Sequence, residues 1–144
     1  MTFAGMNYWA VLAAGVAGFV CGGLYYWVLA KPWMEASEWS AERRAAHAAG
    51  EMKQPVVPMV TAIVADLVMA WVLAGLIGHL GAGQVTIRNG IISAVFVWFG
   101  FVITTLAVNY GFGGRKPMLV VIDGGHWLGV LIVMGAIIGA WGVR

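Results

Sequence analysis

Three ionisable residues, Asp66, Asp123 and His126, lie inside long apolar runs of this 144-residue sequence. An ionised carboxylate at the middle of a bilayer costs at least about 2.5 kcal/mol, so it must be paired, hydrated or protonated. Asp123 and His126 are three residues apart, which places them on neighbouring parts of one helix face. This pattern predicts a proton-titratable or small-solute site, or alternatively a hydrogen-bonded clasp between helices.

The expected depths of these residues bring them to one half of the membrane. At a helical rise of about 1.5 Å per residue, Asp66 lies about 16 Å beyond Pro55, and His126 lies about 13 Å beyond Pro117. Thr105 and Asn109, which share an i, i+4 row with Ser93 on the preceding helix, fall in the same half. We therefore expect one polar cluster that opens toward the cytoplasm, formed by Asp66, Asp123, His126, Asn109 and Thr105.

Composition places these residues in a membrane protein. The chain is 62% hydrophobic and only 10% charged, whereas a soluble domain carries about 25% charged residues. Four apolar runs reach the roughly 18 residues needed to cross a bilayer. They predict an all-α membrane protein with a single domain, residues 1–144, and four transmembrane helices at about 8–29, 55–80, 90–110 and 117–143.

The polar loop between the first two spans has a predicted helix of its own. Lys31-Pro32 is expected to end the first span. Ser37 or Ser40 can cap a short amphipathic helix from Ala41 to Ala49, with Gly50 as its stop. This helix would lie in water or, alternatively, at the membrane interface. The expected interface and lipid-phosphate anchors are Trp33, Trp39, Arg115 and Lys116.

Small and aromatic residues predict how the spans pack and where they leave the bilayer. Small residues let helices approach closely in lipid. In the first span they are Ala10, Ala14, Gly18 and Gly22, and in the fourth they form the pairs Gly125/Gly129 and Gly135/Gly139. Asp66 lies in the i, i+4 row of small residues of the second span, so it is expected to point into the bundle; the row is Ala62, Ala70, Ala74 and Gly78. The first span ends in an expected aromatic belt at the water–lipid boundary, formed by Tyr25, Tyr26, Trp27 and Trp33.

Two similar segments follow the first and third spans. Tyr26 precedes Lys31-Pro32, and Tyr110 precedes Lys116-Pro117. The match indicates either coincidence or a weak parallel duplication of a helical hairpin.

The distribution of Lys and Arg predicts the orientation of the spans. The first and third loops, which share one side, hold six basic residues, whereas the other side holds only Arg88 and Arg144. We therefore expect the first and third loops in the cytoplasm and both termini outside, in the bacterial inner membrane. The sequence has no basic stripe, so nucleic acid is not an expected partner.

No cofactor, metal or catalytic residue is predicted. His79 lies about 36 Å along its helix from the cytoplasmic end and His126 about 13 Å along its own, so one haem iron cannot bridge them. Asp66, Asp123 and His126 have no recognised zinc spacing. Nucleophile-elbow, His-Glu-x-x-His and phosphate-loop motifs are absent from the sequence, which argues against an enzyme.

Short segments in every span carry a family resemblance through their order and spacing. They are Asn7-Tyr8-Trp9-Ala10-Val11, Gly23-Leu24-Tyr25-Tyr26, Lys31 with Trp33-Met34, Met69-Ala70-Trp71-Val72-Leu73-Ala74, Trp98-Phe99-Gly100-Phe101, Asn109-Tyr110 with Gly114-Arg115, Ile122-Asp123 with Gly125, and Met134-Gly135. Together they resemble a family of small four-span bacterial membrane proteins, domain of unknown function 1761. The resemblance implies a fold and a membrane location but no activity.

The chain departs from the family pattern at two places. The Tyr-Ser-Pro that tends to follow the first aromatic pair is absent. The fourth span of the family tends to read Asp, small, Gly, Tyr, His, whereas here His126 stands at the Tyr place and Trp127 at the His place. The resemblance therefore assigns no role to His126.

These observations lead to one expected function and one alternative. We expect passive or proton-linked handling of an ion or small solute, as a small transporter or channel. A homo-oligomer is expected, because four short spans barely enclose a pathway and smooth helix faces favour contacts between subunits. The alternative is a non-catalytic accessory subunit of a larger membrane complex. The expected partners are the lipid bilayer and other membrane-protein chains.

Overall fold

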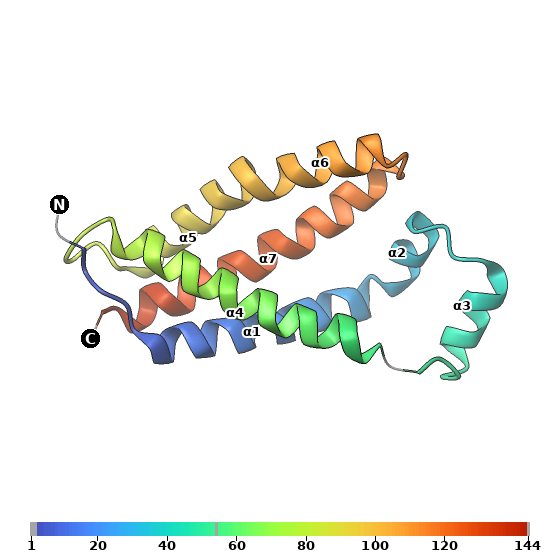
Figure 1. Ribbon diagram of the computed structural model, residues 1–144, viewed down its shortest axis with the longest axis horizontal. Coiled ribbons are helices and arrows are strands. Elements are labelled where there is room, and N and C mark those ends of the chain that lie inside the picture. The colour runs from blue at the N-terminus through green and yellow to red at the C-terminus, as the bar shows by residue number, and fades with distance from the viewer. Residues whose placement is uncertain (1–2, 54, 144) are drawn as a thin grey trace.

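The chain folds as a bundle of four long helices, in a computed structural model that describes residues 3–53 and 55–143. Regular structure within these residues is entirely helical. The first, second and fourth long helices are α1 (Tyr8–Val28), α4 (Val56–Gly78) and α7 (Pro117–Trp141). The third consists of α5 (Ile87–Val97), a π-helical turn η1 (Trp98–Val102) and α6 (Ile103–Phe112), with two short helices, α2 (Ala30–Ala36) and α3 (Ala41–Ala48), in the first loop (Figure 1).

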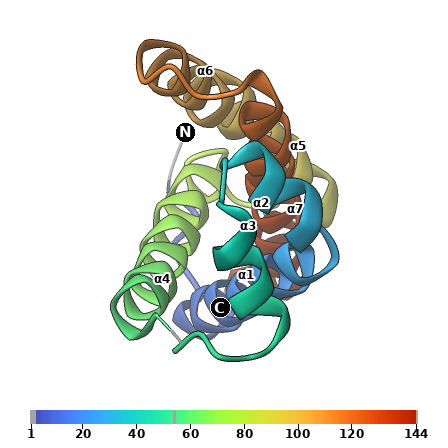
Figure 2. The same cartoon turned by 90° about the vertical axis from the view of Figure 1, so that its right-hand side faces the viewer.

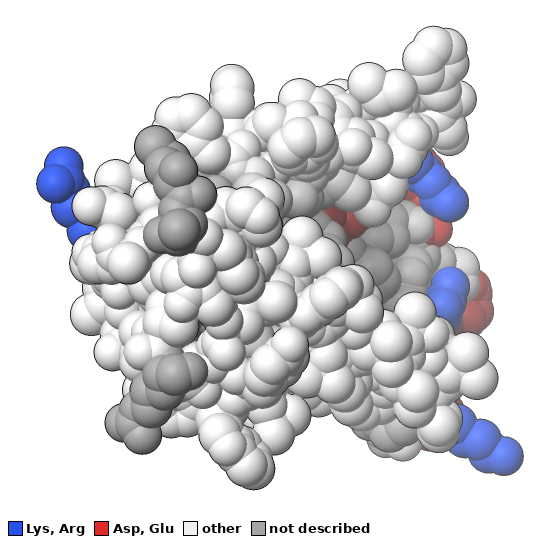
Figure 3. Space-filling model, turned by 60° about the vertical axis from the view of Figure 1, so that its left-hand side comes forward, with Lys and Arg blue, Asp and Glu red and all other residues white. Residues whose placement is uncertain are grey.

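The prediction of four long apolar helices is confirmed. Four helices among the described residues are long and apolar enough to cross a membrane, and their ends lie within three residues of the predicted ones. Both described ends of the chain lie at one end of the bundle with the α4–α5 loop, while α2, α3 and the α6–α7 turn lie at the other (Figure 1). Lys and Arg side chains occur only at these two ends of the face drawn in Figure 3.

Helix α7 is the centre around which the other helices pack. Of an 18-residue apolar stretch of α7, 50% is buried inside the protein. The corresponding share is 28% for α1 and for α4, and 6% for the third span. Helices α1, α4 and α5 contact α7, and α6 packs along it while standing apart from α4 (Figure 2). The largest fully buried side chains lie on α4 and α7, namely Leu73, Ile77, Val130, Leu131 and Met134.

The predicted small-residue faces are helix contacts. The row on α1 faces α7, because a Cβ built at Gly18 would lie 2.4 Å from Met134 Cε. The Gly135/Gly139 pair faces α5, where a Cβ at Gly135 would lie 2.4 Å from the carbonyl oxygen of Gly90. In lipid such close backbone approach supplies packing energy that the hydrophobic effect does not provide.

The first loop differs from the prediction at its start. Helix α1 ends at Val28, and Lys31-Pro32 lies inside α2 instead of ending a helix. Pro32 is the third residue of α2, where the missing N–H would have had no partner within the helix. Helix α3 begins and ends close to the predicted residues, and the cap is Ser40, whose Oγ accepts a hydrogen bond from the Arg43 N–H at 3.2 Å.

Replacing Ser40 with alanine is expected to loosen α3. The loss of one N-cap hydrogen bond costs about 1 kcal/mol, and α3 has no buried residue to compensate. Amide hydrogen exchange should therefore accelerate in residues 41–48 and remain unchanged in α7. Unchanged exchange in α3 would show that contacts other than the cap hold this helix.

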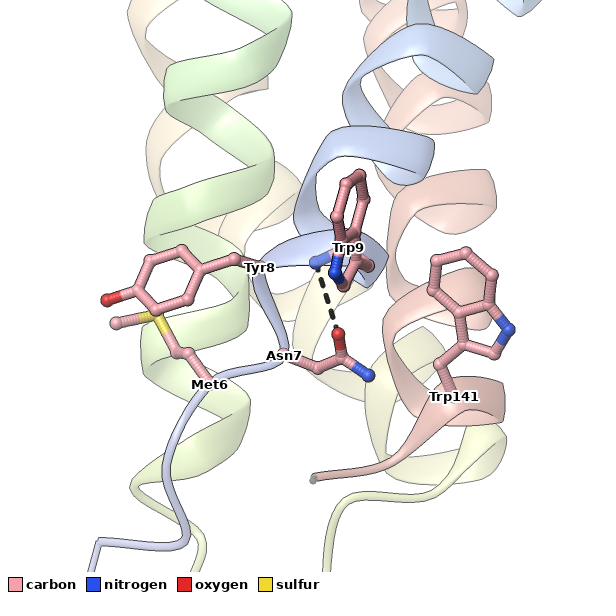
Figure 4. A pocket seen from close by; sticks show the side chains of 5 residues that line it. All are labelled: Met6, Asn7, Tyr8, Trp9 and Trp141. Atoms are coloured by element: carbon pink, nitrogen blue, oxygen red, sulfur yellow. Dashed lines mark hydrogen bonds between the residues drawn. The ribbon is translucent and has the colours of Figure 1, made fainter.

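Aromatic residues gather at the end of the bundle near Asn7 and Trp141. Asn7 caps α1, since its Oδ1 accepts hydrogen bonds from the N–H groups of Trp9 at 3.1 Å and Ala10 at 3.2 Å. Trp9 and Trp141 are exposed around a shallow pocket beside this cap (Figure 4). Amphipathic rings at helix ends favour the water–lipid boundary, which accounts for this group.

Candidate functional site

Asp123 on α7 joins three other helices through one carboxylate. Its side chain is 7% exposed. Tyr26 Oη on α1 donates a hydrogen bond to Oδ1 at 2.7 Å, Trp33 Nε1 on α2 donates to the same oxygen at 3.1 Å, and Tyr110 Oη on α6 donates to Oδ2 at 2.7 Å. A buried carboxylate with donors on both oxygens is satisfied. Asp123 thus ties α1, α2 and α6 to α7, and we call this group of hydrogen bonds the clasp.

Two further aromatic side chains attach to the α7 backbone beside this clasp. Tyr25 Oη donates to the carbonyl oxygen of Ile122 at 2.9 Å, and Trp98 Nε1 donates to that of Gly124 at 2.7 Å. Trp98 belongs to the π-helical turn η1. The first and third spans therefore both hold α7 around Asp123.

These contacts correct the prediction of an aromatic belt after α1. Only Trp27 points outward, with 78% of its surface exposed. Tyr25, Tyr26 and Trp33 turn inward and donate hydrogen bonds to α7. The physical reason is that a buried carboxylate and a backbone carbonyl are acceptors that these O–H and N–H donors would otherwise lack.

The other predicted anchors lie at the same end of the bundle. Trp39 packs against the Arg43 guanidinium, whose carbon lies 3.8 Å from the ring centroid. Lys116 Nζ lies 3.6 Å from Glu38 Oε1 in an exposed ion pair, and Arg115 is exposed. Exposed pairs of this kind contribute at most about 1 kcal/mol.

Asp66 and His126 line an open cavity between α1, α4 and α7. The cavity measures about 800 Å³. Asp66 is 5% exposed and His126 is 8% exposed. Asp66 Oδ1 and His126 Nδ1 are buried and have no hydrogen-bond partner among the described residues. Asp66 thus points away from lipid, as its position in the row of Ala and Gly residues predicted.

A glycine and a group of rings hold His126 in place. A Cβ built at Gly22 would lie 2.5 Å from His126 Nε2, so a side chain at this position would displace the imidazole. The ring centroid of His126 lies 4.6 Å from that of Tyr26 and 4.6 Å from that of Trp127. Tyr26 lines the cavity and also donates to Asp123. The clasp and the cavity therefore share one side chain.

The predicted five-residue cluster is wrong for Thr105 and Asn109. Both side chains are exposed on α6, and within residues 3–53 and 55–143 neither forms a side-chain hydrogen bond. The expected polar row from Ser93 to Asn109 assumed one continuous α-helix. The π-helical turn at Trp98–Val102 interrupts that helix and rotates the face that follows. Tyr110, not Asn109, consequently meets α7.

Sequence analysis missed Tyr26 and Tyr110 as partners of Asp123, although a signal for them existed. The two tyrosines precede Lys31-Pro32 and Lys116-Pro117 at similar distances, and in the structure they donate to the two oxygens of one carboxylate. The match between the two segments thus has a structural counterpart. Among the described residues, no three His, Cys, Asp or Glu side chains are grouped to hold a metal ion.

Four apolar helices of spanning length around a buried carboxylate define a multi-pass helical membrane protein. The family model described as "Protein of unknown function (DUF1761)" matches residues 9–139. The chain therefore belongs to this family, as the resemblance implied. No curated protein and no solved structure matches the chain.

Proposed function

We propose that this protein handles a small solute or ion within the membrane, as a small transporter or channel, at the Asp66–His126 cavity. The observation that supports the proposal is a pair of buried polar atoms, Asp66 Oδ1 and His126 Nδ1, on one cavity without a partner in the described chain. An unsatisfied buried polar group costs about 1–3 kcal/mol. Unpaired groups of this kind in a membrane segment indicate a binding site or pathway.

The position of the cavity favours access from one side of the membrane. Its walls include Val57, Pro58 and Thr61 in the first turns of α4, at the same end of the bundle as α2 and α3 (Figure 1). This end holds six of the basic residues in the sequence, in the first and third loops. By the positive-inside rule, the cavity would open toward the cytoplasm.

A second candidate function is that of an accessory subunit, and the third span favours it. Only 6% of an 18-residue apolar stretch of the third span is buried. Large aromatic residues cover the surface of this span, namely Phe96, Phe99, Phe101 and Phe112. Asn109 adds an exposed amide to the same helix. An amide can hydrogen-bond across a helix interface in lipid. This surface therefore suits a second copy or another membrane protein.

Replacing Asp66 with asparagine tests the solute-handling proposal. In proteoliposomes with an internal pH-sensitive dye and an imposed pH gradient, proton flux should fall at least about tenfold, because the ionisable group in the pathway is lost. Thr61→Val is the matched control. Thr61 also lines the cavity, but its hydroxyl already donates to the Val57 carbonyl oxygen at 2.9 Å, so this variant should retain flux.

Thermal melts in detergent should show that both variants fold. Equal flux through wild-type protein and Asp66→Asn, or no wild-type flux above that of protein-free vesicles, would contradict proton-linked handling. A pull-down in mild detergent tests the accessory role. That role gains support if the wild type recovers a fixed membrane partner and Asp66→Asn does not.

A further inference from the structure

We infer that the cavity binds a small amphipathic amine, meaning an organic cation with at least one N–H group and an apolar body. The inference rests on the solute-handling role proposed above and specifies the chemical class of the solute. Its basis is the combination of two unpartnered polar atoms, Asp66 Oδ1 and His126 Nδ1, with walls that are otherwise mainly apolar and aromatic.

The charge around the cavity favours a cation. Among the described lining residues Asp66 is the only acid, and none is Lys or Arg. Asp123 does not line the cavity, and its two oxygens already accept three hydrogen bonds. An ammonium group would therefore find one unpaired carboxylate, whereas an anion would meet that carboxylate with no basic side chain to offset it.

The hydrogen-bonding groups favour a solute that donates. A carboxylate oxygen accepts hydrogen bonds, and the neutral imidazole accepts at whichever ring nitrogen lacks the proton. An amine with two or three N–H bonds has enough donors for both Asp66 and His126. A hydroxyl group donates only one hydrogen and carries no charge to pair with the carboxylate.

The remaining walls suit the apolar body of such a cation. The rings of Tyr26, His126 and Trp127 pack together, and Tyr and Trp rings attract cations to their faces. The cavity volume of about 800 Å³ lies within the range of about 300–1,000 Å³ found for small-molecule sites. The apolar lining residues are Phe19, Val57, Pro58, Met59, Ala62, Ala65 and Trp127.

Calorimetric titration of the full chain in nanodiscs of zwitterionic lipid tests this inference, with the signal of protein-free nanodiscs subtracted. The probe is benzylamine. Benzyl alcohol, benzoate and benzyltrimethylammonium have a similar ring but are neutral, anionic and without N–H, respectively. We expect benzylamine to bind at least about tenfold more tightly than each of the three, a difference of about 1.4 kcal/mol.

Variants connect this binding to the named residues. Asp66→Asn should weaken benzylamine binding at least about tenfold, and His126→Phe, which keeps a ring, should weaken it by a smaller factor. Thr104→Val on α6 is the control, because Thr104 does not line the cavity and its hydroxyl donates to the Gly100 carbonyl oxygen at 2.9 Å; this variant should bind as the wild type does. Thermal melts identify variants that fail to fold, and in that case competition between benzylamine and benzyl alcohol on the wild type still measures the preference for the cation.

The outcomes separate this inference from the function on which it rests. Equal binding of benzylamine and benzyl alcohol, or unchanged benzylamine binding by folded Asp66→Asn, overturns the assignment of a cation. Equal binding of benzyltrimethylammonium overturns the role of N–H donors. Asp66-dependent proton flux without benzylamine binding refutes the amine and leaves the transport proposal standing. Asp66-dependent benzylamine binding without proton flux supports the amine site and refutes proton-linked handling.

Discussion

Replacing Asp123 with alanine is expected to lower the free energy of unfolding by about 3 kcal/mol, estimated from the loss of three hydrogen bonds to one acidic side chain. Tyr26, Trp33 and Tyr110 would each keep a donor without its acceptor. These donors come from α1, α2 and α6, so one substitution releases three helices from α7. The fraction of SDS that unfolds half of the protein, followed by circular dichroism in mixed micelles, should fall accordingly.

Single-partner variants supply the controls for Asp123. Tyr110→Phe removes one donor and keeps the ring, so it should lower the free energy of unfolding by about 1 kcal/mol. Asp123→Asn retains one accepting oxygen and should lie between Tyr110→Phe and Asp123→Ala. If Asp123→Ala unfolds at the wild-type SDS fraction but loses proton flux, Asp123 belongs to the pathway and is not a clasp.

Replacing Gly135 with alanine is expected to push α5 away from α7. The added Cβ would lie 2.4 Å from the Gly90 carbonyl oxygen and 2.8 Å from its carbonyl carbon. Both atoms belong to helix backbone, so the contact cannot be relieved by moving a side chain. Overpacking of this kind costs about 1–3 kcal/mol, and we expect the upper part of that range because the neighbouring Gly139 approaches Thr86 equally closely.

Gly75→Ala on α4 is the matched control for Gly135→Ala. A Cβ at Gly75 would meet nothing within 4 Å, and alanine is the better helix former by about 0.5–1 kcal/mol. The SDS unfolding midpoint should therefore fall for Gly135→Ala and stay level or rise for Gly75→Ala. Equal midpoints for the two variants would show that α5 and α7 can move apart without lowering the free energy of unfolding.

Local features of the chain were enough to predict the spans and their close contacts. Length and hydropathy are properties of a continuous segment, so the four spans were identified within three residues at each end. Glycine spacing repeats along a helix face, which is why the Gly135/Gly139 pair could be assigned to a helix contact. Asp66 was placed inward for the same reason, because it shares a row with Ala70, Ala74 and Gly78.

The roles of the two aspartates could not be read from their positions along the chain. Asp66 and Asp123 are the same residue type in similar apolar runs, yet three donors from other helices surround Asp123 while Asp66 faces a cavity. A partner on another helix depends on how each helix is rotated and tilted. In a chain whose helices are apolar on most sides, the hydrophobic pattern leaves that rotation poorly specified.

The third span shows the same limit most clearly. Its sequence placed Ser93, Thr105 and Asn109 in one polar row, but the π-helical turn at Trp98–Val102 rotated α6 relative to α5 and presented Tyr110 to Asp123. The sequence alone was enough to predict the membrane class, the number of spans, the inward position of Asp66 and the close glycine contacts. Each of these follows from residues near one another in the chain. Tertiary packing alone established which carboxylate is bonded and which faces a cavity, because those contacts join residues up to 97 positions apart.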